Sequence, residues 1–362
     1  MLPAPAAEFD PVERCGPKGQ LLTETIDAYN SAVTHSIAKG FIFHYDDFVF
    51  GESSLGLLLW FGDLSGARAG WTKMMDTWRH MLALVEAGTT SADAYGYELF
   101  LPASMTFPCS LLAASTSNEL GTLREFASSS TLFGHLLAED GQKVLNDILA
   151  GLVTSMGGWK GDDGIHTGFR LDTWQLVPRG LLHIFEAHDG SPGDASRAAI
   201  LREWLPPPST LLEIAENECT FTYCASGAAH PSLFCARLHG EELGDWEATA
   251  EVAAGMLNIE QFNPTVRCEA YRLLARARAA LGQRDAARES WEAMAAEAVR
   301  AKYVWFEMIA VRELLRGSEG GDADGVRARL GAVLQRVAAS EEELREVLGP
   351  GEWEAVRLAG RG

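Results

Sequence analysis

The stretch YRLLARARAALGQRDAARESW, residues 271–291, has the pattern of two amphipathic helices joined by a tight turn. Gly282 lies between the two halves, and glycine readily adopts the left-handed conformation that ends a helix. Leu274 precedes the turn, and Ala287 and Trp291 follow it, four residues apart as is typical of one helical face. This stretch therefore predicts a helical hairpin.

The same spacing recurs around Gly62, Gly244 and Gly282. The residues five, nine and twelve positions after these glycines are, in order, Ala67, Trp71 and Met74; Thr249, Ala253 and Met256; and Ala287, Trp291 and Met294. Small residues let two helices approach closely, and larger ones fill the adjacent groove. Gly244 and Gly282 are 38 residues apart, a separation within the range of helical-hairpin repeats. We therefore expect the hairpin to be repeated.

These residues resemble the tetratricopeptide repeat family. The resemblance rests on Tyr271, Leu274, Ala275, Ala287 and Trp291, and on the turn Trp60-Phe-Gly-Asp-Leu-x-x-Ala-x-x-x-Trp71. The chain departs from the family pattern at Arg278, where the family has a tyrosine, and at Val299, where it has a closing proline. The resemblance implies an all-α fold of antiparallel helical hairpins stacked into an α-α superhelix, a solenoid with a concave groove.

Proline and glycine clusters suggest how the chain is divided. Residues 1–20 are expected to be a flexible lead-in, 21–205 a divergent helical-repeat part, 211–340 the hairpins, and 341–362 a C-terminal helix and tail. The boundary between the two large parts is expected at Pro206-Pro-Pro208. A third hairpin is expected from helices at 303–315 and 326–337, with a long turn over 317–325.

Composition excludes several classes of partner. The 362 residues are 47% apolar, enough for a large core, and carry a formal charge of −20. Nucleic acids and anionic membrane surfaces attract basic proteins, so neither is an expected partner.

The first residues lack the basic and apolar regions of a signal peptide, and no apolar run is long enough to span a bilayer. We expect a cytoplasmic protein without a cofactor.

Two sets of residues are candidates for metal chemistry. One set is Cys219, Cys224, His230, Cys235 and His239. Their spacing lacks the close ligand pairs of a structural zinc site, so the cysteines are better interpreted as core residues and His239 as a cation near a helix end. The other set is Asp46, Asp47 and Glu52 with Asn146 and Asp147. It resembles part of the magnesium-binding motifs of helical terpene cyclases, and an all-α magnesium-dependent enzyme is therefore the alternative function.

The favoured function is non-catalytic binding of a protein or peptide. In the family register, the first helices of the hairpins line the groove. The residues placed there are Arg272, Arg276, Phe234, Tyr303 and Phe306. Two guanidinium groups beside aromatic rings can bind an acidic peptide or a C-terminal carboxylate. The asparagines of the family's chaperone-tail clamp are missing. Alternatively, Arg272 and Arg276 pair with Glu269 or Glu307 on a solvated face.

Overall fold

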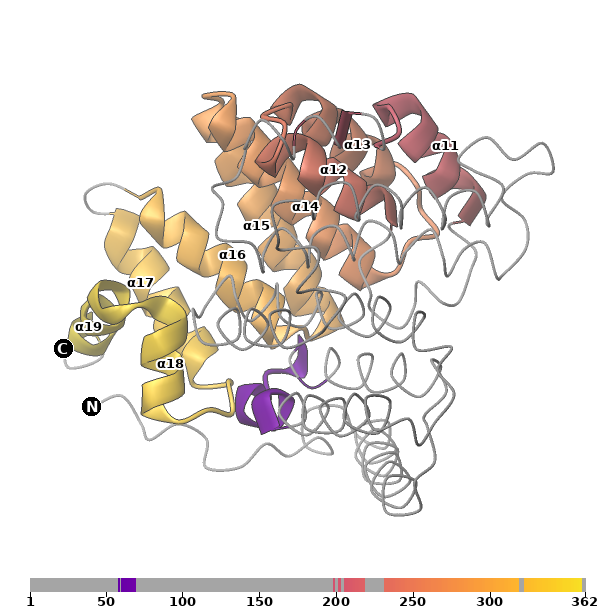
Figure 1. Cartoon of the computed structure of the whole chain (residues 1–362). Coiled ribbons are helices and arrows are strands. Elements are labelled where there is room, and N and C mark those ends of the chain that lie inside the picture. Colours follow the sequence, from indigo (N-terminus) through magenta and orange to yellow (C-terminus); the bar gives the residue numbers. More distant parts are fainter. Residues whose placement is uncertain are drawn as a thin grey trace, which may run out of the picture. The chain divides into compact units, whose positions relative to one another are not determined.

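The computed structural model describes Leu58 and residues 60–69, 198, 201–202, 205–218, 231–318 and 322–359. These residues are 80% helical and contain no strand, which confirms the all-α fold class. The described helices are α11 (Pro208–Glu218), α12 (Pro231–Glu241), α13 (Trp246–Leu257), α14 (Pro264–Ala280), α15 (Arg284–Ala301), α16 (Val304–Arg316), α17 (Asp322–Leu334), α18 (Glu341–Leu348) and α19 (Pro350–Ala359) (Figure 1).

The turns between the helices form where the sequence predicts them. Gly244 separates α12 from α13 with φ 70°, and Gly282 separates α14 from α15 with φ 77°. Gly62 has φ 97° between the helical residues on either side of it. The side chains of Asp245 and Asn263 cap α13 and α14 by accepting hydrogen bonds from backbone N–H groups in the first turn.

The spacing predicted for the second helix of each hairpin is also confirmed by burial. Buried residues at the expected offsets are Ala67, Thr249, Ala253, Met256, Ala287, Trp291 and Met294. Trp71 and Met74, the remaining two positions, lie outside the described residues. The periodicity of the sequence therefore fixes which face of these helices is buried.

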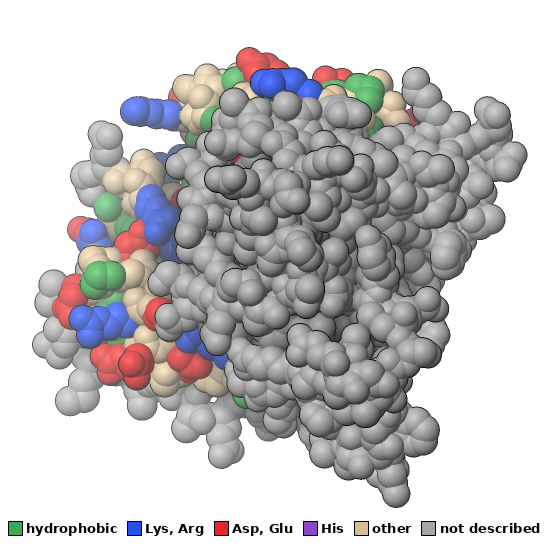
Figure 2. Space-filling model, viewed as in Figure 1, with side chains coloured by type: hydrophobic (Ala, Val, Ile, Leu, Met, Phe, Trp, Pro, Cys, Tyr) green, Lys and Arg blue, Asp and Glu red, His purple; other side chains and the backbone are tan. Residues whose placement is uncertain are grey.

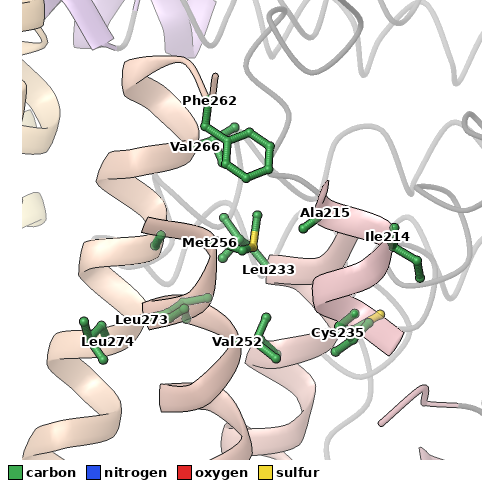
Figure 3. Packing of buried hydrophobic residues seen from close by; sticks show 14 residues of the cluster. Ile214, Ala215, Leu233, Cys235, Val252, Met256, Phe262, Val266, Leu273 and Leu274 are labelled. Carbon is green, nitrogen blue, oxygen red and sulfur yellow. The ribbon is translucent and has the colours of Figure 1, made fainter. Parts of the chain in front are cut away.

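Helices α11 to α14 share one apolar core (Figure 3). Met256 of α13 and Leu233 of α12 lie at its centre, with Ala215 of α11 nearby. Val266 and Leu273 line the side that α14 contributes. Helix α13 packs against α11, α12 and α14, so its apolar face is covered by three neighbours.

The C-terminal elements differ from the expected boundaries. Helix α17 begins at Asp322, so Gly325 lies inside the helix instead of in a long turn. The single helix expected after residue 340 is two helices, α18 and α19, separated by Gly349 with φ 81°. Ser340 and Glu343 form a capping box at the start of α18, which explains why a new helix begins there.

Residues 60–69 pack against elements far along the chain. Trp60 is buried, with its ring centroid 5.5 Å from Tyr303 and 6.3 Å from Phe306. The N–H of Ala338 donates to the carbonyl oxygen of Gly62 at 2.7 Å. Arg68 forms an ion pair with Glu346 at 3.1 Å. In an array of repeats each unit contacts only its sequence neighbours. These contacts instead join segments more than 200 positions apart in the sequence.

The described residues form two compact units. One contains residues 58–69 and 291–359, and the other contains residues 198–290. The change from one unit to the other falls between Ser290 and Trp291, inside α15, whereas the boundary expected at Pro206-Pro-Pro208 lies within a single unit. The lead-in at 1–20 and most of the expected part at 21–205 lie outside the described residues.

Candidate functional site

The turn between α12 and α13 builds the base of the candidate site. Glu241 is the last residue of α12, and Trp246 is the first residue of α13. Between them, Gly244 reverses the chain, and Asp245 accepts a hydrogen bond from the N–H of Ala248 at 3.0 Å. Local turn and cap chemistry therefore fixes a carboxylate and an indole ring close together.

Gly240 makes room for the Trp246 ring. A Cβ atom at position 240 would lie 2.6 Å from two carbons of the ring and 2.7 Å from Oγ1 of Thr249. Thr249 itself donates to the carbonyl oxygen of Ala236 at 2.7 Å, which ties α13 to α12. The ring of Trp246 can therefore lie directly against the backbone of α12.

Helix α14 adds the positive charge. Nη1 of Arg276 donates to Oε1 of Glu241, and the guanidinium carbon lies 6.0 Å from the centroid of the Trp246 ring. Nε of Arg237 donates to Oε2 of the same carboxylate at 2.8 Å. Each oxygen of Glu241 thus holds one guanidinium group, and Arg276 also makes a cation–π contact. We call Arg237, Glu241, Trp246 and Arg276 the Arg276 cluster.

The charges of the Arg276 cluster shift the titration of its members. Burial by itself raises the pKa of the Glu241 carboxyl, but the positive charges of Arg237 and Arg276 outweigh burial and lower the pKa to about 2. Burial lowers the pKa of Arg276, and the carboxylate of Glu241 acts in the opposite direction. A guanidinium group stays charged at neutral pH, so the site is an ionised pair of arginines around one carboxylate.

Arg272 lies beside the cluster but is not open to a partner. Its Nε donates to Oε2 of Glu269 at 2.8 Å, and its side chain is 9% exposed. The side chain of Arg276, by contrast, is 37% exposed. Of the two arginines proposed from the sequence, Arg272 is paired as in the alternative interpretation. Arg276 pairs with Glu241, whereas Glu307, the other expected partner, accepts a hydrogen bond from Arg336 at 2.5 Å.

The aromatic residues expected in the groove are placed differently. Phe306 is 0% exposed, so it belongs to the core and its expected place on an open groove is corrected. Tyr303 is half-buried, and its ring packs on Trp60 and Phe61. Both lie in the unit that contains residues 291–359, whereas Arg272 and Arg276 belong to the other unit. The side chain of Phe234 lies outside the described residues.

The metal candidates are described only in part. Cys235 is buried, and burial raises the pKa of its thiol. Nε2 of His239 lies 2.9 Å from the carbonyl oxygen of Pro206, and His239 is in the last turn of α12, the position near a helix end that the sequence predicts. Among the described residues, no three metal-ligand side chains come together. The remaining candidates lie outside those residues: Cys219, Cys224, His230, Asp46, Asp47, Glu52, Asn146 and Asp147.

Sequence reasoning found Arg276 but missed the groups that hold it. Arg237 and Glu241 are four residues apart on one helix, the spacing of a helical ion pair, and this signal was available. Trp246 directly follows the Gly244-Asp245 turn, which places it at a helix start. The pairing of Glu241 with Arg276 joins residues 35 positions apart, and no local pattern predicts it.

Comparison of the chain with protein-family models, curated proteins and solved structures finds no match. None of the described helices is long and apolar enough to cross a lipid bilayer.

Proposed function

We propose that this chain is a cytoplasmic helical-hairpin protein that binds a protein or peptide partner without catalysing a reaction. In this proposal the hairpins are tetratricopeptide-like, as the positive-φ glycines and the buried small residues after them suggest. The proposal needs no cofactor. It is carried by one observation: Arg276 presents a partly exposed guanidinium group that Glu241 and Trp246 hold in a defined position.

A fixed, partly exposed arginine suits recognition for two reasons. Its planar donors match a carboxylate in a bidentate geometry. Its contacts with Glu241 and the Trp246 ring limit the rotamers it can adopt, so less conformational entropy is lost when a ligand binds. Arg272 supplies further positive charge nearby without direct exposure.

The surface of the described residues favours a polar contact. Val299, at 52% exposed, is the one exposed large hydrophobic side chain among them. On the face seen in Figure 2, Lys, Arg, Asp and Glu side chains make up much of the coloured surface, and hydrophobic side chains appear only in scattered small areas. A partner of this part of the chain would therefore bind through charged and hydrogen-bonding groups more than through an apolar patch.

The proposal can be tested with a peptide library screened against the full chain. Peptides selected by the wild type are then measured by fluorescence anisotropy against Arg276→Glu and Arg284→Glu. Arg284 is exposed at the start of α15 and undergoes the same change of charge, so it is the matched control. We expect Arg276→Glu to weaken binding at least about tenfold, as for loss of a desolvated charged contact, and Arg284→Glu to bind as the wild type does.

Circular dichroism of both variants checks that each is folded. Failure of the folded wild type to select any peptide would refute the proposal. Equal binding by the wild type and Arg276→Glu would show that the peptide binds away from Arg276. The proposal would then lose the observation that carries it.

A further inference from the structure

The contacts that hold Arg276 use only some of its hydrogen-bond donors. It donates to Glu241 through Nη1, and its Nε and Nη2 have no hydrogen-bond partner among the described residues. One edge of the guanidinium fork therefore has donors that no described residue uses, on a side chain that is 37% exposed. Arg276 already binds the carboxylate of Glu241, which shows that a carboxylate fits this guanidinium group.

We infer that Glu241 competes inside the molecule with a carboxylate of the partner for Arg276. In this arrangement the partner's carboxylate binds Arg276 in a bidentate manner through Nε and Nη2. Its negative charge repels that of Glu241 on the same guanidinium group, so Glu241 turns to Arg237 alone. The inference rests on the proposed function and names the chemical group of the partner and the residue that regulates access to it.

The exchange leaves no buried charge without a partner. Glu241 keeps its 2.8 Å hydrogen bond from Arg237 when Arg276 lets go, and Arg276 keeps the ring of Trp246. Breaking a buried ion pair is costly chiefly because it leaves an uncompensated charge. Because Glu241 and Arg276 each keep a second partner, that cost is small here.

Charge balance also limits the partner. The positive charges of Arg237, Arg272 and Arg276 act on Glu241, and Arg272 also pairs with Glu269, so these five side chains carry one net positive charge. The chain as a whole carries −20. A run of acidic residues or a dianionic phosphate would be repelled by the protein at large. A single carboxylate on an otherwise neutral or basic segment fits both the local charge and the total charge. It can come from a chain terminus or from a glutamate or aspartate side chain.

The test uses the full chain and three fluorescein-labelled pools of octapeptides built from glycine, alanine, serine and valine. The first pool ends in a free carboxylate, the second in an amide, and the third in an amide with one internal glutamate. Binding is measured by anisotropy for the wild type, Glu241→Gln, Arg237→Gln and the control Glu251→Gln. Glu251 is an exposed residue of α13 that loses the same charge.

We expect the wild type to bind at least one carboxylate pool more tightly than the amide pool. Glu241→Gln should bind that pool about two- to fivefold more tightly, the range of a partly exposed ion pair, and Glu251→Gln should match the wild type. Arg237→Gln should bind it more weakly, because Glu241 would be left unpaired when Arg276 turns to the ligand. The two variants therefore shift the affinity in opposite directions. The pool that responds identifies the source of the carboxylate.

Equal binding of all three pools by the wild type and by Glu241→Gln would overturn the inference. So would an unchanged or lower affinity in folded Glu241→Gln. Neither result would decide the proposed function, because the library selection with Arg276→Glu tests that function for any peptide chemistry.

Discussion

At the end of α15, Lys302 adopts φ 61°, a left-handed conformation that Gly282 adopts with φ 77° at the end of α14. The hydrogen bonds around the two residues correspond. The N–H of Tyr303 donates to the carbonyl oxygen of Ala298, and the N–H of Gln283 donates to that of Arg278, both at 2.8 Å. A hydrogen bond from an N–H to the carbonyl oxygen five residues earlier is typical of the Schellman motif, whose left-handed residue is usually glycine. A side chain at Lys302 therefore adds backbone strain that Gly282 avoids.

Lys302→Gly and Gly282→Ala should change stability in opposite directions. Relieving the left-handed strain at Lys302 should raise the free energy of unfolding by about 1 kcal/mol, and introducing it at Gly282 should lower that free energy by a similar amount. Urea denaturation followed by circular dichroism measures both. Shifts of the same sign would show that the two helix ends do not share one conformation.

Gly240 is required for a different reason, the close approach of the Trp246 ring. Gly240→Ala should destabilise the chain by about 1–3 kcal/mol, because the new methyl group overlaps the ring. Gly331→Ala is the control. It also lies in a helix, its Cβ would be 3.8 Å from Val356, and the change should stabilise by about 0.5–1 kcal/mol. Thermal melting of the two variants checks this contrast, and a neutral Gly240→Ala would mean that the ring can move away.

At the scale of elements, the sequence predicted the features that depend on local spacing. The offsets from Gly244 correctly placed Thr249 and Met256 in the core, because both lie on one helix whose period is known. The start of α17 was expected at Val326, four residues after its first residue, Asp322. Gly325 accounts for that difference, since glycine favours turns in isolation but is tolerated inside a helix when tertiary contacts stabilise it.

The contact of α12 with α14 should depend on pH through Glu241. Its pKa is about 2 in the folded chain and near the ordinary value of 4.5 when the chain is unfolded. Because the folded value is the lower one, the stabilisation is complete above about pH 5 and is lost as the pH falls through 4.5 towards 2. Wild type should therefore exceed Glu241→Gln in free energy of unfolding at pH 7, and the difference should shrink at pH 3. Urea denaturation at both values measures it, and a constant difference would mean that the carboxylate charge contributes nothing.

At the scale of the molecule, two observations lie beyond what repeat spacing can predict. Nine consecutive residues of α16, Val304–Arg312, are buried, so this helix is covered on all faces. A helix in an open array of hairpins exposes one face. The hydroxyl of Ser65 donates to Glu343 across 278 positions of sequence. Amphipathic periodicity reports which face of a helix is buried but not which distant segment covers it, so neither feature follows from the sequence.

The burial of Trp60 against Tyr303 and Phe306 makes the stability of α16 depend on a segment more than 200 positions away. Trp60→Ala removes a fully packed indole ring and should lower the free energy of unfolding by about 3–5 kcal/mol. Phe61→Ala, a ring that meets Tyr303 edge-on and is only half-buried, should cost less. Hydrogen exchange followed by mass spectrometry can distinguish this packing from an array in which only sequence neighbours stabilise one another. If only neighbours stabilise one another, Trp60→Ala should speed exchange near residues 58–69 alone. The observed packing instead predicts faster exchange in α16 as well, since the rings of Tyr303 and Phe306 lose the surface that covers them.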